Sequence, residues 1–270
     1  MVKELNQIYN MDCLDGMREI GDKTVDLTVT SPPYDNLREY KGYKGYSLDF
    51  VNLTHELFRI TKVGGVVVWV VGDAIIDGSE SGTSFKQALY FKEIGFNLHD
   101  TMIYQKNCYP FPPSNRYFGV FEYMFVFSKN TPKTTNLIRV KTKNKEFNPH
   151  STNRQENGNT IVQKYECGKY SRIKDNIWKY DVGYNKSTKD EIAYDHPATF
   201  PEQLANDHII SWSNKGDLVM DPFMGSGTTA KMAIINERNF IGFEISKEYC
   251  DIANTRIKNA QSQGKIGTWF

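Results

Sequence analysis

Two short motifs at opposite ends of the chain carry residues suited to chemistry on a small ligand. Ser31, Pro32, Pro33 and Tyr34 follow an apolar run near the N-terminus, and Asp-Pro-Phe-Met-Gly-Ser-Gly-Thr-Thr occupies residues 221–229. The first motif places hydrogen-bond acceptors beside an aromatic ring. The second is a glycine-rich turn of the kind that joins a strand to a helix and receives a nucleotide-like cofactor. Together they predict transfer of a group onto a nucleobase amine.

The first motif suits the activation of an exocyclic amine. Such an amine is a weak nucleophile because its lone pair is delocalised into the ring, so an enzyme must aim acceptors at its N–H groups. The hydroxyl of Ser31 and the carbonyl of Pro32 can be those acceptors, and the two prolines stiffen the turn. Tyr34 offers a ring on which an extruded base can stack. A stiff turn with a half-buried tyrosine is the structural alternative for this motif taken alone.

The second motif has the features of a cofactor loop. Gly225 and Gly227 would allow a ligand to approach the backbone, whose N–H groups and helix dipole face it. Glu244 ends the next expected strand, where a carboxylate can accept hydrogen bonds from ribose hydroxyls. The motif lacks the Gly-Lys-[Ser/Thr] ending of ATP-binding loops and departs from Gly-x-Gly-x-x-Gly. A cofactor with a ribose but no pyrophosphate therefore fits best.

The elements around both motifs alternate between strand and helix. Apolar periodicity and glycine or proline breaks define them. The pattern predicts a doubly wound, mostly parallel sheet with one antiparallel hairpin, in which Gly64 and Gly65 stop the first long helix. In chain order, we expect strands at 7–10 and 25–30, a helix at 48–60, a strand at 66–71, a helix at 85–94, strands at 99–106 and 117–129, a helix at 200–212, a strand at 217–223, a helix at 225–236, a strand at 239–246 and a helix at 247–260.

The middle of the chain differs from both ends in composition. Residues 130–195 are rich in Lys, Asn, Thr, Gly and Tyr, which predicts an inserted recognition segment between a catalytic half at 1–129 and a cofactor-binding half at 196–270 of the same domain. Its basic and aromatic residues suit contacts with phosphates and bases, although a solvated surface insertion is the alternative. They are Arg139, Lys141, Lys143, Lys145, Arg154, Lys164, Lys169, Arg172 and Lys174, with Tyr165, Tyr170 and Trp178.

Composition narrows the class of protein. The chain has 270 residues and a formal net charge of +1, so it does not have the overall positive charge of a small electrostatic DNA binder. Its four cysteines form no Cys-x-x-Cys pair, and we expect neither a metal site nor a disulfide framework. The longest strongly apolar run, 66–71, is too short to cross a bilayer. A cytoplasmic protein without membrane contact is expected.

Four segments, in this order, resemble the amino-methylating DNA methyltransferases that use S-adenosylmethionine. They are VTSPPY at 29–34, HPATFPEQL at 196–204, DPFMGSGTT at 221–229 and GFEIS at 242–246. The catalytic motif precedes the cofactor motif, as in the beta-type order of that family. The resemblance covers nearly the whole chain except its middle segment, and it implies a Rossmann-like methyltransferase fold with an inserted target-recognition segment.

The resemblance also implies roles for individual residues. The four residues of the Ser31 motif would be catalytic. Asp12 stands where an acidic residue reads the adenine end of the cofactor, and the segment from His196 to Phe200 stands where a loop closes over the methionine end. An ordinary loop histidine is the alternative for His196. The full set of residues implied to bind the cofactor is Asp12, Cys13, His196, Phe200, Asp221, Pro222, Phe223, Gly225, Gly227, Thr228 and Glu244.

The serine that opens the catalytic motif bears on the target base. A leading serine resembles the N4-cytosine branch of the family, whereas N6-adenine enzymes of this group more often carry Asp or Asn. We therefore expect N4-cytosine methylation at a short site in double-stranded DNA, with N6-adenine second. An RNA or small-molecule methyltransferase and a catalytically silent DNA-binding module are further alternatives. A monomer or homodimer, and a cognate restriction endonuclease as partner, are compatible with this resemblance.

Overall fold

The computed structural model describes residues 4–33, 48–107, 111–112, 115–141, 150–164, 171–197, 199 and 201–264. The chain divides into two compact units. The main unit comprises Met1–Asn136 and Asn176–Phe270, and the insert unit comprises Leu137–Asp175. None of the described helices is long and apolar enough to cross a membrane.

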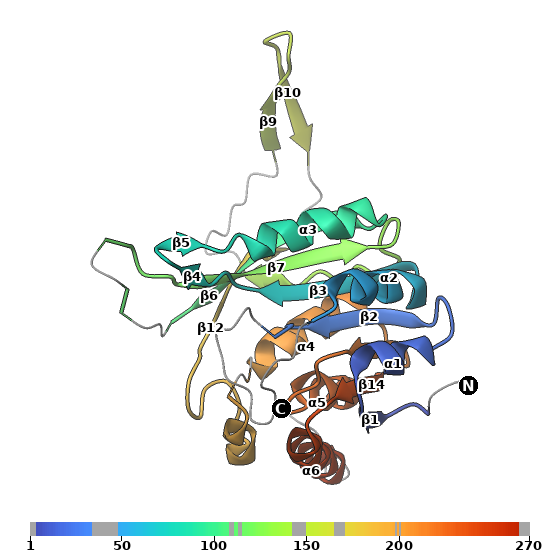
Figure 1. Cartoon of the computed structure of the whole chain (residues 1–270). Coiled ribbons are helices and arrows are strands. Elements are labelled where there is room, and N and C mark those ends of the chain that lie inside the picture. Colours follow the sequence, from blue (N-terminus) through green and yellow to red (C-terminus); the bar gives the residue numbers. More distant parts are fainter. Residues whose placement is uncertain are drawn as a thin grey trace. The chain divides into compact units, whose positions relative to one another are not determined.

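The main unit is built on a sheet whose described part has eight strands in the order β1-β14-β13-β2-β3-β7-β6-β12 (Figure 1). β7 runs antiparallel to β3 and β6, and the other neighbours are parallel. This confirms the predicted doubly wound sheet with its antiparallel hairpin. The strands are β1 Gln7–Asn10, β2 Val25–Thr30, β3 Thr61–Val71, β6 Asn97–Lys106, β7 Phe121–Ser128, β12 Ile177–Tyr180, β13 Leu218–Asp221 and β14 Asn239–Glu244, beside a small ladder of β4 Ile75–Ile76 with β5 Ser79–Glu80.

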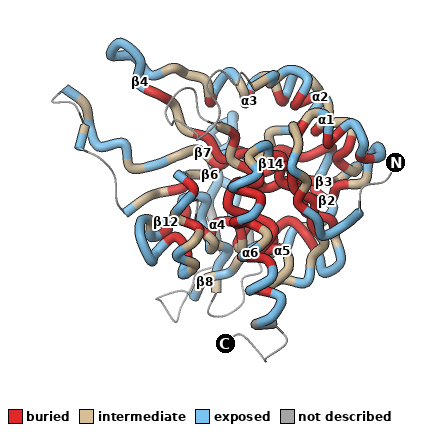
Figure 2. Tube along the Cα trace, turned by 60° about the horizontal axis from the view of Figure 1, so that its bottom comes forward, coloured by how far each residue is buried: buried red, intermediate tan, exposed pale blue. Residues whose placement is uncertain are grey.

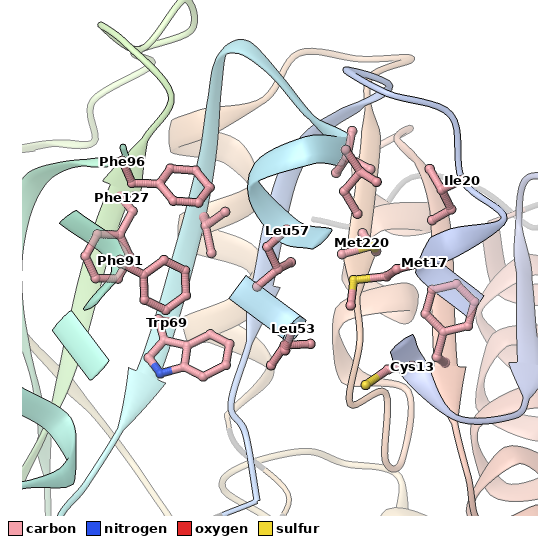
Figure 3. Packing of buried hydrophobic residues seen from close by; sticks show 14 of the residues in the cluster. Cys13, Met17, Ile20, Leu53, Leu57, Trp69, Phe91, Phe96, Phe127 and Met220 are labelled. Atoms are coloured by element: carbon pink, nitrogen blue, oxygen red, sulfur yellow. The ribbon is translucent and has the colours of Figure 1, made fainter. Parts of the chain in front are cut away.

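Helices cover both faces of this sheet (Figure 1). They are α1 Cys13–Arg18, α2 Phe50–Ile60, α3 Thr83–Glu93, α4 Glu202–Trp212, α5 Thr228–Ile235 and α6 Lys247–Gly264, with a 3₁₀ helix at Glu191–Asp195. α1, α2 and α3 pack on one face, where Leu53, Leu57 and Phe91 surround Trp69 of β3 (Figure 3). α4, α5 and α6 cover the other face. The central strands are therefore buried along their length, as their continuous apolar runs require (Figure 2).

The glycine pair after α2 has a different role from the one predicted. α2 ends at Ile60, and β3 already begins at Thr61, so Gly64 and Gly65 lie inside the strand. The pairing register between β2 and β3 shifts between the pairs Val25–Thr61 and Leu27–Val66, a stretch of β3 that contains both glycines. Gly64 has a φ of +82°, and a Cβ there would lie 2.8 Å from the Cβ of Lys133. The glycines thus permit an irregular strand rather than ending a helix.

The insert unit consists of short antiparallel pairs in its described part. β9 (His150–Arg154) pairs with β10 (Thr160–Lys164), and β8 (Arg139–Lys141) pairs with β11 (Ser171–Ile173). The basic residues Arg139, Lys141, Arg154, Lys164, Arg172 and Lys174 lie in this described part. Lys143, Lys145, Tyr165, Lys169 and Tyr170 lie outside the described residues. Recognition of a target by the segment 130–195 stays a prediction.

β12 belongs to the sheet of the main unit, although it falls within the predicted segment 130–195. Trp178 on this strand is 5% exposed, and its ring lies 4.8 Å from that of His208. Tyr180, two residues on, donates its hydroxyl to Asp207 of α4 at 2.9 Å. The prediction that Trp178 contributes to a DNA-contacting face is wrong, because strand alternation turns it into the core.

Candidate active site

Both motifs lie at one edge of the sheet because neighbouring parallel strands end there. β1, β14, β13 and β2 are adjacent in that order. Asp12 follows β1, Glu244 ends β14, Asp221 ends β13 and Ser31 follows β2. The carboxyl edge of such a sheet is where α/β proteins bind their ligands. The fold therefore brings together four of the predicted site residues from two distant parts of the sequence.

A buried carboxylate joins the two motifs. Thr30, which precedes Ser31, donates its hydroxyl to Oδ1 of Asp221 at 2.6 Å. The Thr229 hydroxyl, at the far end of the cofactor motif, lies 2.8 Å from Oδ2 of Asp221 and 3.1 Å from the carbonyl oxygen of Val29. Thr30 and Thr229 are site residues that the sequence pattern did not single out. Their only sequence signal is their position, Thr30 directly before the catalytic motif and Thr229 at the end of the cofactor motif.

Asp221 is enclosed by protein. Its side chain is 1% exposed, and burial raises its pKa to about 6. The hydrogen bonds from Thr30, the amide of Phe223 and Thr229 act in the opposite direction and lower the pKa. Both carboxylate oxygens thus have protein donors, so the geometry favours a connecting role for Asp221 over direct contact with a ligand.

The glycine-rich turn is held in place largely by hydrogen bonds that its own backbone amides donate. Four amides of the described turn donate to protein acceptors, so most of the N–H groups expected to face the cofactor are occupied. The pairs are Phe223 to Oδ1 of Asp221, Met224 to the Phe243 carbonyl, Gly225 to Oε2 of Glu244 and Gly227 to the Met224 carbonyl.

Glu244 supports the turn and still offers acceptor capacity. Its Oε2 accepts the Gly225 amide at 2.9 Å, and its Oε1 accepts the Ser246 amide at 2.8 Å. Burial raises the pKa of Glu244, and these two amides oppose that shift. Each carboxylate oxygen has two lone pairs, so hydroxyl donors of a ribose could be accepted beside these amides.

The two glycines of the turn leave room for protein neighbours. A Cβ at Gly225 would lie 2.9 Å from Nε2 of His196, and one at Gly227 would lie 2.7 Å from the Cβ of Ala253 on α6. The His196 ring is largely buried and meets the ring of Tyr249 at 4.3 Å between centroids. The space predicted to admit a ligand is therefore occupied on these sides by protein.

Asp12 and Cys13, at the start of α1, differ in how deeply they are buried. Oδ1 of Asp12 accepts the Leu14 amide at 2.8 Å and so caps α1, and the side chain is only partly buried. Cys13 is 3% exposed and belongs to the apolar cluster beneath α1. Asp12 thus lies at the carboxyl edge of the sheet, whereas Cys13 packs into the core.

The remaining predicted residues surround the turn and the catalytic motif. Pro32, Pro222 and Thr228 are buried, while Ser31, Pro33 and Phe223 are partly exposed. Tyr34 and Phe200 lie outside the described residues, as do residues 38–46, a tyrosine-rich stretch that follows the catalytic motif. A cavity of about 320 Å³ opens beside Pro33, and its other lining residues are Leu48, Phe50, Thr83, Lys86, Gln87 and Tyr90.

Trp69 connects this cavity with the cofactor motif. Its ring centroid lies 6.0 Å from that of Phe50, which lines the cavity, and 6.4 Å from that of Phe223 in the motif. Its indole N–H donates to Oε1 of Gln87 at 2.8 Å. Ring packing through the buried Trp69 therefore connects the cavity beside Pro33 with Phe223 of the cofactor turn. Residues 25–255 match the family model described as DNA methylase, N6_N4_Mtase.

The chain belongs to the N6/N4 DNA methylase family. The predicted family is confirmed, and with it a DNA amino-methyltransferase that uses S-adenosylmethionine. The methylase is 59% identical over 245 residues to the orphan methyltransferase M.BamHII of Bacillus amyloliquefaciens, covering 89% of this chain and 91% of the relative. It is 27% identical to the Type II methyltransferase M.BglII of Bacillus subtilis, covering 93% and 68% of the two chains.

Solved structures share the fold of the methylase. The PvuII DNA methyltransferase, described as cytosine-N4-specific, superposes with a TM-score of 0.67 at 19% identity, covering 97% of this chain and 93% of that one. The M1.HpyAVI–SAM complex gives a TM-score of 0.60 at 24% identity, covering 93% and 98%. At these identities the likeness establishes the architecture.

The contact between Gly227 and α6 leads to a first prediction. Gly227→Ala in the methylase places a methyl group against Ala253 and strains a backbone with φ +82°. Gly216→Ala is the matched control, because Gly216 has φ +84° and a methyl group added there would meet nothing within 4 Å. We expect Gly227→Ala to lower the free energy of unfolding in urea by about 1–3 kcal/mol more than Gly216→Ala does. Equal costs would show that α5 and α6 separate without resistance.

Proposed function

We propose that this methylase transfers a methyl group from S-adenosylmethionine to the N4 amine of cytosine at a short site in double-stranded DNA. The observation that carries the proposal is the contact of Asp221 with both Thr30 and Thr229. It holds Ser31, one residue beyond Thr30, beside the turn that would receive the cofactor. An amine-polarising group and a methyl donor must meet in this way for direct transfer.

The residues at the strand ends fit the cofactor. Asp12 and Glu244 follow or end the neighbouring strands β1 and β14, and their carboxylates suit the hydroxyl and amine donors of an adenosine. When bound, the cofactor supplies an electrophilic methyl group. We assign Asp221 to joining the motifs, since its carboxylate is buried and bonded to both of them, and we assign His196 to shaping the turn through Gly225.

The protein's part in the transfer is to hold and polarise the amine. The Ser31 hydroxyl and the Pro32 carbonyl accept its N–H groups, which favours a more tetrahedral nitrogen whose lone pair can attack. Pro32 is buried at the end of β2, so its carbonyl starts from a fixed position. The surplus proton then leaves to water. No covalent intermediate with the protein is required.

The proposed target base and the proposed partners rest on sequence features. Ser31 supports cytosine over adenine, and the basic insert unit supports duplex DNA as the substrate. A monomer or homodimer and a cognate restriction endonuclease stay predictions, as does a cytoplasmic location.

The decisive experiment identifies the methylated base. The protein is incubated with mixed-sequence duplex DNA and S-adenosylmethionine labelled in its methyl group, and the DNA is digested to nucleosides for mass spectrometry. We expect label in N4-methylcytosine. Label in N6-methyladenine would overturn the cytosine assignment, and absence of label from both bases would overturn DNA as the substrate. DNA incubated with labelled cofactor but no protein is the control.

A further inference from the structure

Arg256 of α6 is a fully buried cation that lies outside all four sequence motifs. Its side chain has no exposed surface. Nε donates to Asp190 at 2.9 Å, Nη2 donates to Glu202 at 2.6 Å, and Nη1 donates to the Ser226 carbonyl at 2.6 Å. Three edges of one guanidinium therefore contact three separate parts of the chain.

A second cation shares the same carboxylates. Lys231 of α5 lies 2.8 Å from Asp190 and 2.8 Å from Glu202. Burial alone would raise the pKa of Asp190, but hydrogen bonds from Arg256 and Lys231 outweigh it and bring the pKa below its ordinary value. The charges of these four side chains balance, as buried ionic groups require.

The Arg256 guanidinium contacts the cofactor turn directly. Besides the Ser226 carbonyl, Nη1 lies 3.1 Å from the Ser226 hydroxyl and 3.2 Å from the Thr228 hydroxyl. The carbonyl contact fixes the orientation of the peptide between Ser226 and Gly227. The Lys231 ammonium, by contrast, donates to the two carboxylates.

The two carboxylates lie on either side of the segment that carries His196. Asp190 and Glu202 flank it, and Thr188 donates its hydroxyl to Glu202 at 2.6 Å. The Thr199 hydroxyl lies 3.4 Å from that of Ser226. Arg256 therefore connects the turn with the segment lying against it, in which the ring of His196 faces Gly225.

A buried ion pair alone is weak evidence for a functional role, since apolar side chains of similar volume often stabilise as well. Apolar packing cannot replace the directional hydrogen bonds that this guanidinium makes. A planar guanidinium can hold a carboxylate on each of two edges and a backbone carbonyl on the third, whereas a lysine ammonium is a point charge without that fork.

We infer that Arg256 is a positioning residue for the cofactor turn, setting its shape through Ser226 and placing the His196 segment through Asp190 and Glu202. The inference rests on the proposed cofactor site. It requires that loss of the planar guanidinium raises the Kd for S-adenosylmethionine by more than the accompanying loss of folding stability explains.

The test compares Arg256→Lys with two other variants of the full chain. Lys231→Gln removes the second cation but keeps every contact between Arg256 and the turn. Arg238→Lys is the matched control, because Arg238 also donates to backbone carbonyls, those of Ser213 and Asn236, at the start of β14, the end of the strand opposite Glu244. Calorimetry gives the Kd for S-adenosylmethionine, thermal unfolding without cofactor gives stability, and kcat is measured at saturating cofactor.

We expect Arg256→Lys to raise the Kd about tenfold or more, with kcat at saturation changing much less. Arg238→Lys should leave the Kd unchanged, and Lys231→Gln should raise it far less than Arg256→Lys. A Kd for Arg256→Lys within about twofold of wild type overturns the inference, and so does an equal rise in Lys231→Gln, which would indicate general loosening.

Two further outcomes are separable. If Arg256→Lys does not fold, Asp190→Asn, which loosens one arm of the same guanidinium, must still weaken binding, and unchanged binding in that variant overturns the inference. Wild-type protein that binds no S-adenosylmethionine overturns the proposed cofactor site itself, and the inference with it.

Discussion

Replacing Ser31 by alanine is expected to lower kcat about 100- to 1,000-fold, the usual loss when one polarising group is removed from an active site. The hydroxyl is proposed to act on the amine as its lone pair becomes available, so its effect is largest in the transition state. The KM for S-adenosylmethionine should change little, because the cofactor turn is held through Thr30 and Asp221. Steady-state kinetics on duplex DNA measure both quantities.

A second serine controls for the loss of a hydroxyl. Ser128 of β7 is fully buried, and its hydroxyl has no hydrogen-bond partner among the described residues. Ser128→Ala should leave kcat within about twofold of wild type, because no hydrogen bond is lost. Full activity in Ser31→Ala would refute the role given to that hydroxyl, and a parallel loss in both variants would point to folding instead.

Asp221→Asn is expected to remove a pH-dependent destabilisation of the folded protein. Burial raises the pKa of Asp221 from 3.8 to about 6 on folding. Between these values the folded state binds more protons than the unfolded state, so stability contributed by this group is present at low pH and lost as pH rises through 6. The full difference corresponds to roughly 3 kcal/mol. Asparagine does not titrate there.

Urea unfolding of both proteins from pH 4.5 to 7.5 measures this effect. The wild-type free energy of unfolding should fall relative to that of Asp221→Asn as pH rises across this range. Asp15→Asn, at an exposed position on α1, makes the same change in net charge and removes only a surface ion pair with Arg18, which contributes little to stability. A flat difference between wild type and Asp221→Asn would mean that Asp221 stays ionised throughout, with its threonine donors outweighing burial.

The sequence was sufficient to predict the meeting of the two motifs. Each motif follows or ends a buried strand, and parallel strands end at one edge of a doubly wound sheet. Its periodicity could not predict which strands are neighbours. The contact between Thr30 and Asp221, 191 positions apart, depends on β13 lying next to β2. The positions of Thr30 and Thr229 in or beside the motifs therefore do not reveal that both contact Asp221.

Local composition predicts poorly whether a residue is buried or exposed where tertiary contacts decide its position. Trp178 lies in a polar stretch whose composition predicts a DNA surface, yet β12 pairs with β6 and turns it into the core. Arg256 lies on a mainly polar helix, where an arginine is ordinarily solvated. Only the packing of α6 against the 3₁₀ segment and α5 shows that it is buried.

The strand order has a consequence for how the methylase is made. β13 and β14 come from the last quarter of the sequence, but they lie between β1 and β2 from its beginning. During synthesis, β1 and β2 therefore emerge long before the strands that separate them, and both keep unpaired edges until the C-terminal region leaves the ribosome. Such edges template association with other chains. Correct folding of this protein is consequently a late, whole-chain event, and a truncated chain that stops before β13 is an aggregation hazard rather than a half-built enzyme.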